Sequence, residues 1–363
     1  MALLDEGRRI GDNYEVERFL GQGAFAQVYR VQHRFLGRQA MKVFKRVGTP
    51  EETREMLGEA ILLSKIGHPN IVRVFDADTV ETARGRCGFF TMEYVAGGSL
   101  WNFWQSHEDR RVGIGDAVRI LGQICDGLAV AHGETPPIIH RDITLQNVLI
   151  GYDRDGLRVR VSDFGLARQV DLLTGLASAK GTLAFKAPET LRYGRGDSPA
   201  GDVWAVGMIA YLLLTDTLPY SDTRSPITFF GASRSESLEA PRSINSDVDE
   251  ALSGIVLAAL EPNPRNRIRD AAELGEALAA WESRGPADLE RAPRATATQV
   301  LGHRPRADEG EAREQAARAV ALADQAGSLR EAADLMEEAC NRSAPVRSEY
   351  EPRLRLWRKG VVG

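Results

Sequence analysis

Two short segments carry acidic and amide side chains in an order that could form a phosphoryl-transfer site. The segment HRDITLQN, residues 140–147, contains Asp142 and Asn147, and VSDFGLA follows with Asp163. Carboxylate and amide oxygens are ligands that Mg²⁺ accepts, which suits Asn147 and Asp163. A carboxylate can also orient an acceptor hydroxyl and take its proton, which suits Asp142. Each residue alone could be an ordinary turn or cap residue, but their joint occurrence in this order favours a site.

Residues upstream could hold phosphate groups beside these acids. In GQGAFAQV, residues 21–28, two glycines would let backbone N–H groups approach phosphate oxygens. Lys42 follows in the strand-like run QAMKVF, and Glu59 lies in the helical pattern after it. If that helix packs on the strands, Glu59 can reach Lys42 and fix its position. The alternatives are a common glycine hairpin, an outward-pointing lysine and a solvated helix glutamate.

The elements that must position these residues form two groups. Five β-rich runs between Tyr14 and Val95 predict a small antiparallel sheet, and Met56, Ala60 and Leu63 recur at helical spacing within residues 51–67. After residues 97–98 the pattern becomes helical, with Asp116 as the expected N-cap of the helix over 117–132. The runs VLI and RVRV are expected to be adjacent strands that hold the acidic residues together. The five predicted strands are YEVERFLG, AQVYRVQH, QAMKVFKR, IVRVFDAD and GFFTMEYV.

Composition indicates a soluble globular protein that does not bind nucleic acid. The chain has 363 residues, and a hydrophobic content of 43% is enough to bury a core. Its 46 basic and 51 acidic residues are mixed along the chain, and three distant cysteines, Cys87, Cys125 and Cys340, suggest reduced structural thiols. The first sixteen residues lack the features expected of a signal peptide, and the apolar run 203–214 is shorter than the ~20 residues of a membrane span. We therefore expect a cytoplasmic protein without a membrane span.

The C-terminal quarter changes in character twice. Residues 284–310 contain prolines and scattered charges and predict a flexible linker. Residues 311–360 predict a helical module, with one apolar stripe through Ala316 and Ala323 and another through Ala333 and Cys340. The first two helices are similar in their small residues to one tetratricopeptide unit. A single unit cannot bury its own apolar face, so it must pack on the rest of the chain or on a partner.

The motifs together resemble a eukaryotic-type (Hanks-type) protein kinase domain, as found in bacterial serine/threonine kinases, over roughly three quarters of the chain. The resemblance implies an α+β fold of two lobes, with a kinase domain over 10–283 that divides into about 10–95 and about 96–283. It is carried, in family order, by GQGAFAQV, QAMKV, Glu59, HPNIV, MEYVAGGSL, HRDITLQN, DFG, APE and DVWAVG.

This resemblance also implies a cofactor set and a role for individual residues. ATP would bind between the lobes with Mg²⁺, or Mn²⁺ as the alternative, held by Asn147 and Asp163. Lys42 would contact the α- and β-phosphates, Glu59 would orient Lys42, and Asp142 would be the catalytic base. Structural roles are implied for Asp202, which would support the HRD loop, and for Glu189 paired with Arg267. The implied ATP-binding residues are Leu20, Gly21, Gly23, Ala26, Val28, Ala40, Lys42, Met92, Glu93, Val95 and Leu149.

Two positions depart from the family pattern. Ala26 replaces the third glycine of the phosphate loop, and one methyl group should weaken phosphate binding little. Thr144 stands where serine/threonine kinases carry a lysine that meets the γ-phosphate. By analogy with the loss of one transition-state donor, this change should cost about 2 to 4 kcal/mol. We expect Thr144→Lys to preserve or raise activity.

The segment between DFG and APE suggests the substrate class and the control of the enzyme. Gly181-Thr182 resembles the GT of serine/threonine kinases, and HRDITLQN lacks the AAR of tyrosine kinases. Arg141 could dock a phosphorylated segment, for which Thr174, Ser178 and Thr182 are candidate phosphorylation sites. In the linker, ATATQVLG is either an ordinary polar segment or, once Thr298 is phosphorylated, a ligand for a forkhead-associated domain.

The resulting interpretation is a cytoplasmic serine/threonine kinase that transfers the ATP γ-phosphate to protein hydroxyls and phosphorylates itself in signalling. One rival is a pseudokinase, an ATP-binding scaffold whose output is conformational, with Thr144 as its sign. Another is a kinase-fold enzyme that acts on a small molecule, and the APE motif counts against it. Scaffolds of this kind usually lose the equivalents of Lys42, Asp142 or Asp163, and this chain retains all three.

Overall fold

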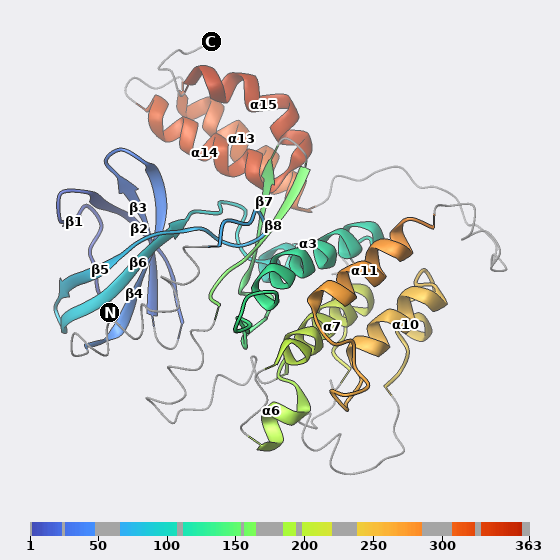
Figure 1. The fold of residues 1–363 in the computed structure, drawn as a ribbon. Coiled ribbons are helices and arrows are strands. Elements are labelled where there is room, and N and C mark those ends of the chain that lie inside the picture. The colour runs from blue at the N-terminus through green and yellow to red at the C-terminus, as the bar shows by residue number, and fades with distance from the viewer. Residues whose placement is uncertain are drawn as a thin grey trace.

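The structure is a computed structural model that shows two lobes and a separate group of C-terminal helices (Figure 1). A sheet forms the N-terminal lobe, and a larger group of helices forms the second lobe beside it. The α+β, two-lobed fold expected from the sequence is therefore confirmed. The described residues are 2–23, 26–47, 66–106, 112–153, 156–164, 184–193, 198–219, 238–284, 307–323 and 328–357.

The N-terminal lobe is one antiparallel sheet with the strand order β1-β2-β3-β4-β6-β5. Its strands follow the alternating burial that a sheet with one buried face requires. Along most of β3, buried and partly exposed residues alternate, and Tyr29 and Val31 are fully buried. The predicted strand from Ile71 begins three residues later, because Ile71 bridges to Val161 of the helical lobe. The strands are β1 (Arg9–Ile10), β2 (Tyr14–Gln22), β3 (Ala26–His33), β4 (Gly37–Val47), β5 (Val74–Thr82) and β6 (Gly85–Glu93).

The helical lobe is built around one helix that is buried almost throughout, α7 (Pro199–Thr215). It contains the apolar run that is too short for a membrane span, and no helix in the described part of the chain is long and apolar enough to cross one. A Cβ at Gly207 would lie 3.0 Å from the Cβ of Ala259, so α7 and α10 pack closely and leave little room for a side chain there. The other helices are α2 (Leu100–Gln105), α3 (Ile114–His132), α6 (Pro188–Tyr193), α9 (Pro241–Ile244), α10 (Glu250–Ala259) and α11 (Ala271–Glu282).

One predicted helix start is wrong. α3 begins at Ile114, with Gly113 as its N-cap, and Asp116 lies in the first turn. A carboxylate in the first turn still favours the helix N-terminus through the helix dipole, so the residue fits but the boundary differs. The other expected local element is present: β7 (Val148–Asp153) and β8 (Gly156–Val161) pair as an antiparallel hairpin.

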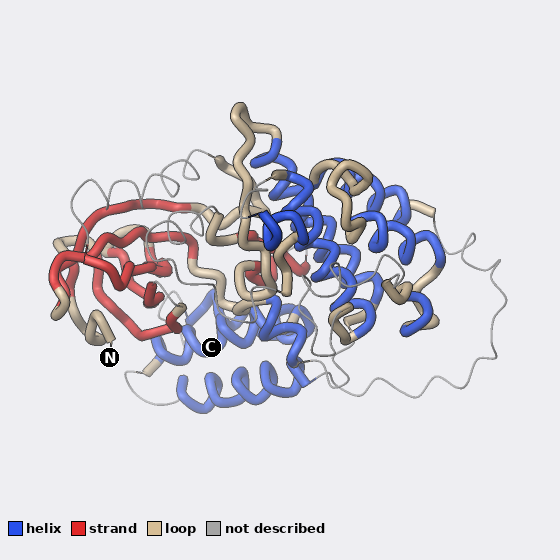
Figure 2. Tube along the Cα trace, turned by 90° about the horizontal axis from the view of Figure 1, so that it is seen from below, coloured by secondary structure: helices blue, strands red, loops and turns tan. Residues whose placement is uncertain are grey.

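The C-terminal module consists of α13 (Ala307–Ala323), α14 (Leu329–Arg342) and α15 (Ala344–Trp357). The helices share an apolar core of small residues, with Ala316, Ala333 and Cys340 on the predicted faces. α13 begins four residues inside the stretch expected to be linker, and residues 285–306 lie outside the described part of the chain. Figures 1 and 2 both show the module against the junction of the two lobes.

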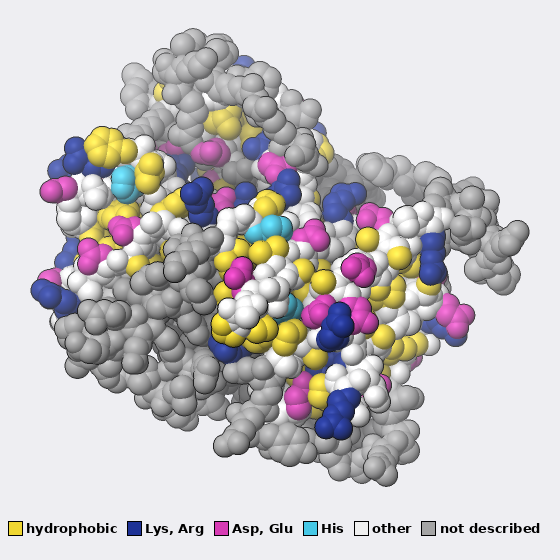
Figure 3. Space-filling model, viewed as in Figure 1, with side chains coloured by type: hydrophobic (Ala, Val, Ile, Leu, Met, Phe, Trp, Pro, Cys, Tyr) yellow, Lys and Arg dark blue, Asp and Glu magenta, His cyan; other side chains and the backbone are white. Residues whose placement is uncertain are grey.

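Charged and apolar side chains are distributed in the way expected of a stable globular chain. Figure 3 shows Lys and Arg interspersed with Asp and Glu over the described surface of the helical lobe. The cysteines Cys87, Cys125 and Cys340 are buried and free. They act as small apolar residues of three separate cores.

Candidate active site

A cleft of about 650 Å³ lies between the two lobes. It is lined by residues of the sheet, of the connector after β6, of β7 and of the C-terminal helices. Of the predicted ATP-binding residues, it brings together Leu20, Val28, Ala40, Met92, Glu93, Val95 and Leu149. Apolar side chains above and below with backbone polar groups at one edge are the usual composition of a small-molecule site.

The glycine turn is placed at the end of the β2–β3 hairpin and does not line this cleft. The Gly23 N–H donates to the Ala26 carbonyl at 3.0 Å, which closes the turn. A Cβ at Gly21 or Gly23 would meet no atom of the described residues within 4 Å. Packing among the described residues therefore does not explain these glycines, whereas close approach of a phosphate would. Ala26 is buried in the apolar cluster of the sheet.

Lys42 and Asp163 form the central ion pair of the site. Lys42 Nζ lies 2.7 Å from Asp163 Oδ2, and both side chains are mostly buried. The other carboxylate oxygen, Oδ1, is buried and has no hydrogen-bond partner among the described residues. Asp163 also has φ +63°, a left-handed conformation that costs energy outside glycine and is found at functional sites. Glu59, the predicted partner of Lys42, lies outside the described residues.

Asp202 organises the loop that carries Asp142. Its buried carboxylate accepts the N–H of His140 at 2.7 Å and the N–H of Arg141 at 2.9 Å. His132 Nε2 lies 3.0 Å from the same carboxylate. These contacts hold Arg141 at φ +70°, a second left-handed residue next to the proposed base. The supporting role that the sequence suggests for Asp202 agrees with this geometry.

His140 is a neutral structural residue behind the loop. Its Nε2 lies 2.8 Å from the Ser162 carbonyl, which can only accept, so Nε2 carries the hydrogen. Its Nδ1 accepts the Asp142 N–H at 3.2 Å. Complete burial lowers the pKa of His140, although the carboxylates of Asp202, Asp142 and Asp163 act in the opposite direction.

This burial predicts acid sensitivity. Below the ordinary histidine pKa of 6.5 the unfolded chain binds a proton that folded His140 does not, so the free energy of unfolding falls. For one group the slope is at most about 1.4 kcal/mol per pH unit, and it ends at the lowered pKa. His140→Gln can keep a donor to Ser162 and does not titrate. Urea unfolding at about pH 7.5 and about pH 5.5 should show a smaller loss in this variant, and equal losses would contradict the assignment.

Asn147 ties Asp142 to the segment that carries Asp163. Its side-chain amide donates to the Asp142 carbonyl at 2.8 Å and to Asp142 Oδ2 at 3.1 Å. The Asn147 carbonyl accepts the N–H of Ser162 at 2.8 Å. Since Ser162 directly precedes Asp163, the three residues singled out in the sequence converge at the base of the cleft.

Thr144 is buried, with 4% of its surface exposed, and brings no charge to this loop. A cation is nevertheless present beside Asp142. Lys186 Nζ donates to the Arg141 carbonyl at 2.7 Å and lies 3.6 Å from Asp142 Oδ1. The sequence analysis did not identify Lys186. The feature that could have indicated it is a lysine directly before the APE motif in a chain that has no lysine at residue 144.

The residues present fit a magnesium ion that also needs ligand oxygens from a phosphate. Asp163 Oδ1 is a buried acceptor without a partner among the described residues, and the backbone carbonyl of Asn147 accepts the N–H of Ser162, the residue directly before Asp163. The described residues contain no group of three or more His, Cys, Asp or Glu that could hold a metal by itself. Mg²⁺ is commonly held by one or two carboxylates together with substrate phosphates, so this sparse set suits it.

The sequence and structure match known proteins over the two lobes. The protein kinase domain family matches residues 14–277. CBL-interacting protein kinase 4 of Oryza sativa subsp. japonica is 33% identical over 269 residues, which cover 72% of this chain and 56% of that protein. Serine/threonine-protein kinase PknB of Mycolicibacterium smegmatis is 31% identical over 74% of this chain and 42% of that protein. Pkn1 of Myxococcus xanthus is 33% identical over 75% and 38%. The chain thus spans about half, or less, of the length of these relatives.

A solved structure shows the same fold. The crystal structure of the Mycobacterium tuberculosis PknI kinase domain has a TM-score of 0.56 and 24% sequence identity, and covers 78% of this chain and 100% of that chain. At this identity the likeness concerns the fold.

Proposed function

The chain belongs to the protein kinase domain family, and on that premise we propose that it is a serine/threonine protein kinase that transfers the ATP γ-phosphate to protein hydroxyls. The observation that carries the proposal is the convergence of Lys42, Asp142, Asn147 and Asp163 next to the cleft between the lobes. A scaffold that only bound nucleotide would not need the loop that carries Asp142 to be held by the buried Asp202.

ATP is proposed to bind with its adenine between Ala40 and Leu149, against the connector at Met92–Val95. Lys42 would then lie at the inner end of the cleft, where its ammonium group can contact the α- and β-phosphates. Magnesium bound at Asp163 and Asn147 would neutralise and orient the phosphate oxygens. Lys42, which pairs with Asp163 in the structure, would remain beside both groups.

In the proposed reaction the hydroxyl of a substrate serine or threonine attacks the γ-phosphorus. A bond forms between the hydroxyl oxygen and phosphorus, the bond from phosphorus to the bridging oxygen breaks, and ADP leaves. Asp142 orients the hydroxyl and accepts its proton. The Asn147 amide keeps the Asp142 carboxylate in position through its hydrogen bond to Oδ2.

The preference for serine and threonine rests on the sequence and on the names of relatives such as PknB. Gly181-Thr182, Thr174 and Ser178 lie outside the described residues, as does Thr298 of the linker. We propose autophosphorylation within residues 165–183, and binding of a forkhead-associated domain to phosphorylated Thr298. Mass spectrometry that finds Thr174, Ser178 and Thr182 unmodified in fully active protein would refute the first. Failure of a phosphothreonine-298 peptide to bind such domains would refute the second.

The proposal is tested by incubating the purified chain with ATP labelled at the γ-phosphate and a general acceptor protein. We expect label transfer that requires Mg²⁺, stops on chelation, and yields phosphoserine and phosphothreonine on hydrolysis of the product. Label on tyrosine alone would correct the substrate class. Nucleotide binding without any transfer would favour the pseudokinase scaffold instead.

A further inference from the structure

The catalytic loop obtains a cation from a segment that is distant in the sequence. Residue 144, where the family pattern has a lysine, is a buried threonine. Lys186 reaches the loop from the segment directly before α6, with its Nζ 2.7 Å from the Arg141 carbonyl and 3.6 Å from Asp142 Oδ1. Only 15% of its side chain is exposed.

The segment around Lys186 is held firmly, so the position of its ammonium group is defined. Its neighbours Phe185 and Ala187 are buried, with 9% and 3% of their surface exposed. Three residues after Lys186, Glu189 is bound by both terminal nitrogens of Arg267, at 2.8 and 2.9 Å. A lysine anchored in this way on both sides loses little conformational entropy when it binds a further anion.

We propose that Lys186 supplies the positive charge that stabilises the γ-phosphate during transfer, in place of a lysine at residue 144. This inference rests on the proposed kinase function. As the acceptor oxygen bonds to phosphorus and ADP leaves, negative charge on the transferred group lies next to Asp142, where Lys186 offsets it. Lys186 keeps its proton throughout, and the hydroxyl proton goes to Asp142.

A purely structural role for Lys186 makes a different prediction. If the lysine only ties down the strained Arg141 backbone, its removal should lower stability and all activities together. If its charge is needed, kcat should fall while the KM for ATP and the melting temperature change little. The two roles can therefore be separated by the pattern of effects.

The experiment compares Lys186→Ala with two double variants in the full chain. We expect Lys186→Ala to lower kcat about 100-fold, as for loss of one donor to a transition state. Adding Thr144→Lys should recover at least about tenfold, because the new ammonium group enters the same site. Adding Thr144→Met should recover none of the lost kcat, because methionine is similar in size to lysine but carries no charge.

Each result has a defined meaning. Unchanged kcat in Lys186→Ala would overturn the inference, and so would a loss that Thr144→Lys does not recover in a protein that melts as the wild type does. Equal recovery by Thr144→Met would also overturn it, because charge would then not matter. A wild-type chain that transfers no phosphate would instead refute the proposed function, so the two failures are distinct.

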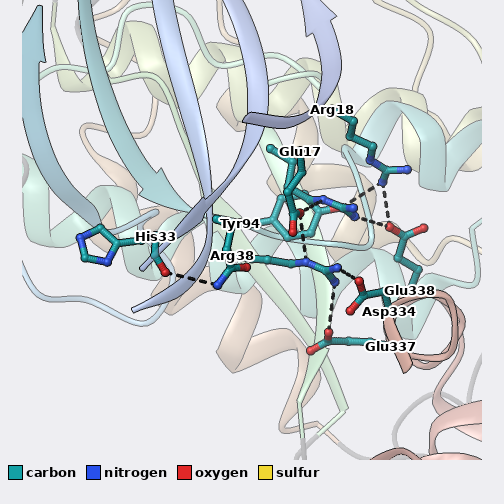
Figure 4. A network of polar contacts seen from close by, with 10 residues as sticks. Glu17, Arg18, His33, Arg38, Tyr94, Asp334, Glu337 and Glu338 are labelled. Atoms are coloured by element: carbon teal, nitrogen blue, oxygen red, sulfur yellow. Dashed lines mark hydrogen bonds and ion pairs between the residues drawn. The ribbon is translucent and has the colours of Figure 1, made fainter. Parts of the chain in front are cut away.

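A separate observation concerns the C-terminal module, which contacts both lobes. Three arginines on neighbouring strands, Arg18, Arg30 and Arg38, pair with acidic residues of α14. Figure 4 shows Arg18 and Arg38 directed toward Glu338 and Asp334. Glu338 accepts from Arg18 and from Arg30, each at 2.8 Å, and Arg38 pairs with Asp334. The side chains of Arg30 and Glu338 are only 11% and 13% exposed, so water screens this network less than a surface pair.

The same module reaches the other side of the connector. Arg347 of α15 donates to the Tyr152 carbonyl at the end of β7, and α14 packs against β7. Glu311 and Arg342, which lie 3.5 Å apart, line the opening of the cleft. The module therefore bridges the two lobes next to the cleft between them.

From this bridge we infer a second function: the docked module holds the lobes at a fixed angle and slows the release of nucleotide. Opening of the cleft needs the sheet to move relative to β7, and the module is attached to both. Breaking the attachment on the sheet side should free this movement. The effect is expected on the dissociation rate, since the bridge limits the opening of the cleft through which bound nucleotide would leave.

The test reverses one charge in the network. In the full chain, Glu338→Arg places a third cation against Arg18 and Arg30, and Glu331→Arg on an exposed position of the same helix is the matched control. Dissociation of a fluorescent ADP analogue should be about 3- to 10-fold faster in Glu338→Arg and unchanged in the control. Hydrogen exchange in α14 would report detachment. A detached module with an unchanged dissociation rate would overturn the inference, and so would a module that stays docked despite the reversed charge.

Discussion

Replacement of Asp142 by asparagine is expected to lower the rate of phosphoryl transfer about 100- to 10,000-fold, the usual contribution of a general base. Asparagine has nearly the same shape and can still accept the hydrogen bond from the Asn147 amide, which lies 3.1 Å from Asp142 Oδ2. It cannot take the hydroxyl proton. The loss should therefore appear in kcat, with nucleotide affinity preserved.

The measurement is label transfer from ATP under saturating Mg²⁺, with nucleotide binding followed in parallel by calorimetry. Asp126→Asn is the matched control, because Asp126 is an exposed acid on α3 outside the cleft. It should transfer phosphate at the wild-type rate. Equal transfer by wild type and Asp142→Asn would show that Asp142 is not the base, and would favour the scaffold.

Replacement of Arg267 by methionine is expected to lower the free energy of unfolding by about 3 to 5 kcal/mol, the cost of breaking a buried pair by removing one partner. The Arg267 side chain is fully buried and binds both carboxylate oxygens of Glu189, at 2.8 and 2.9 Å. It also donates to the carbonyls of Ala200 and Glu261, each at 2.8 Å. Methionine fills similar volume but leaves these acceptors without donors.

Urea unfolding monitored by circular dichroism would measure this loss. Arg269→Met is the control, because that arginine is two residues away and exposed, and its unfolding midpoint should equal that of the wild type. A double variant with Glu189→Gln should recover part of the loss, since the unpaired charge is then removed. A full-sized effect in Arg269→Met, or none in Arg267→Met, would contradict this account of the pair.

Much of the fold could be predicted because it depends on local patterns. Alternation along β3 and the continuous apolar run of α7 are properties of a few consecutive residues, and both elements are present as expected. The errors lie at boundaries. Ile71 leaves its strand to pair with Val161, and Asp116 falls in the first turn of α3 because Gly113 already caps the helix. In both cases a contact outside the local pattern decided where the element begins or ends.

The candidate site was predictable in its residue types and less so in its contacts. Asp142 and Asn147 lie five residues apart in one loop, so their hydrogen bond is nearly a local property. Lys42 and Asp163 come from different lobes, and the motif order alone suggested their convergence. The Lys42 side chain points toward Asp163 Oδ2 because of how strand β4 packs relative to the helical lobe, and the sequence pattern does not specify that packing.

The sequence by itself determined the kinase motifs, the two-lobed fold and the absence of a lysine at residue 144. It could do so because motifs and periodicities are properties of residues that are close together in the sequence. Only the tertiary structure decided that Lys186 lies beside Asp142 and binds the Arg141 carbonyl, 45 residues earlier in the sequence. It also decided that Glu338 pairs with Arg18, which is 320 residues away in the sequence. Contacts at such separations depend on how whole elements pack, since packing sets the direction and burial of each side chain. For this reason the cation of the site and the attachment of the C-terminal helices emerged from the fold.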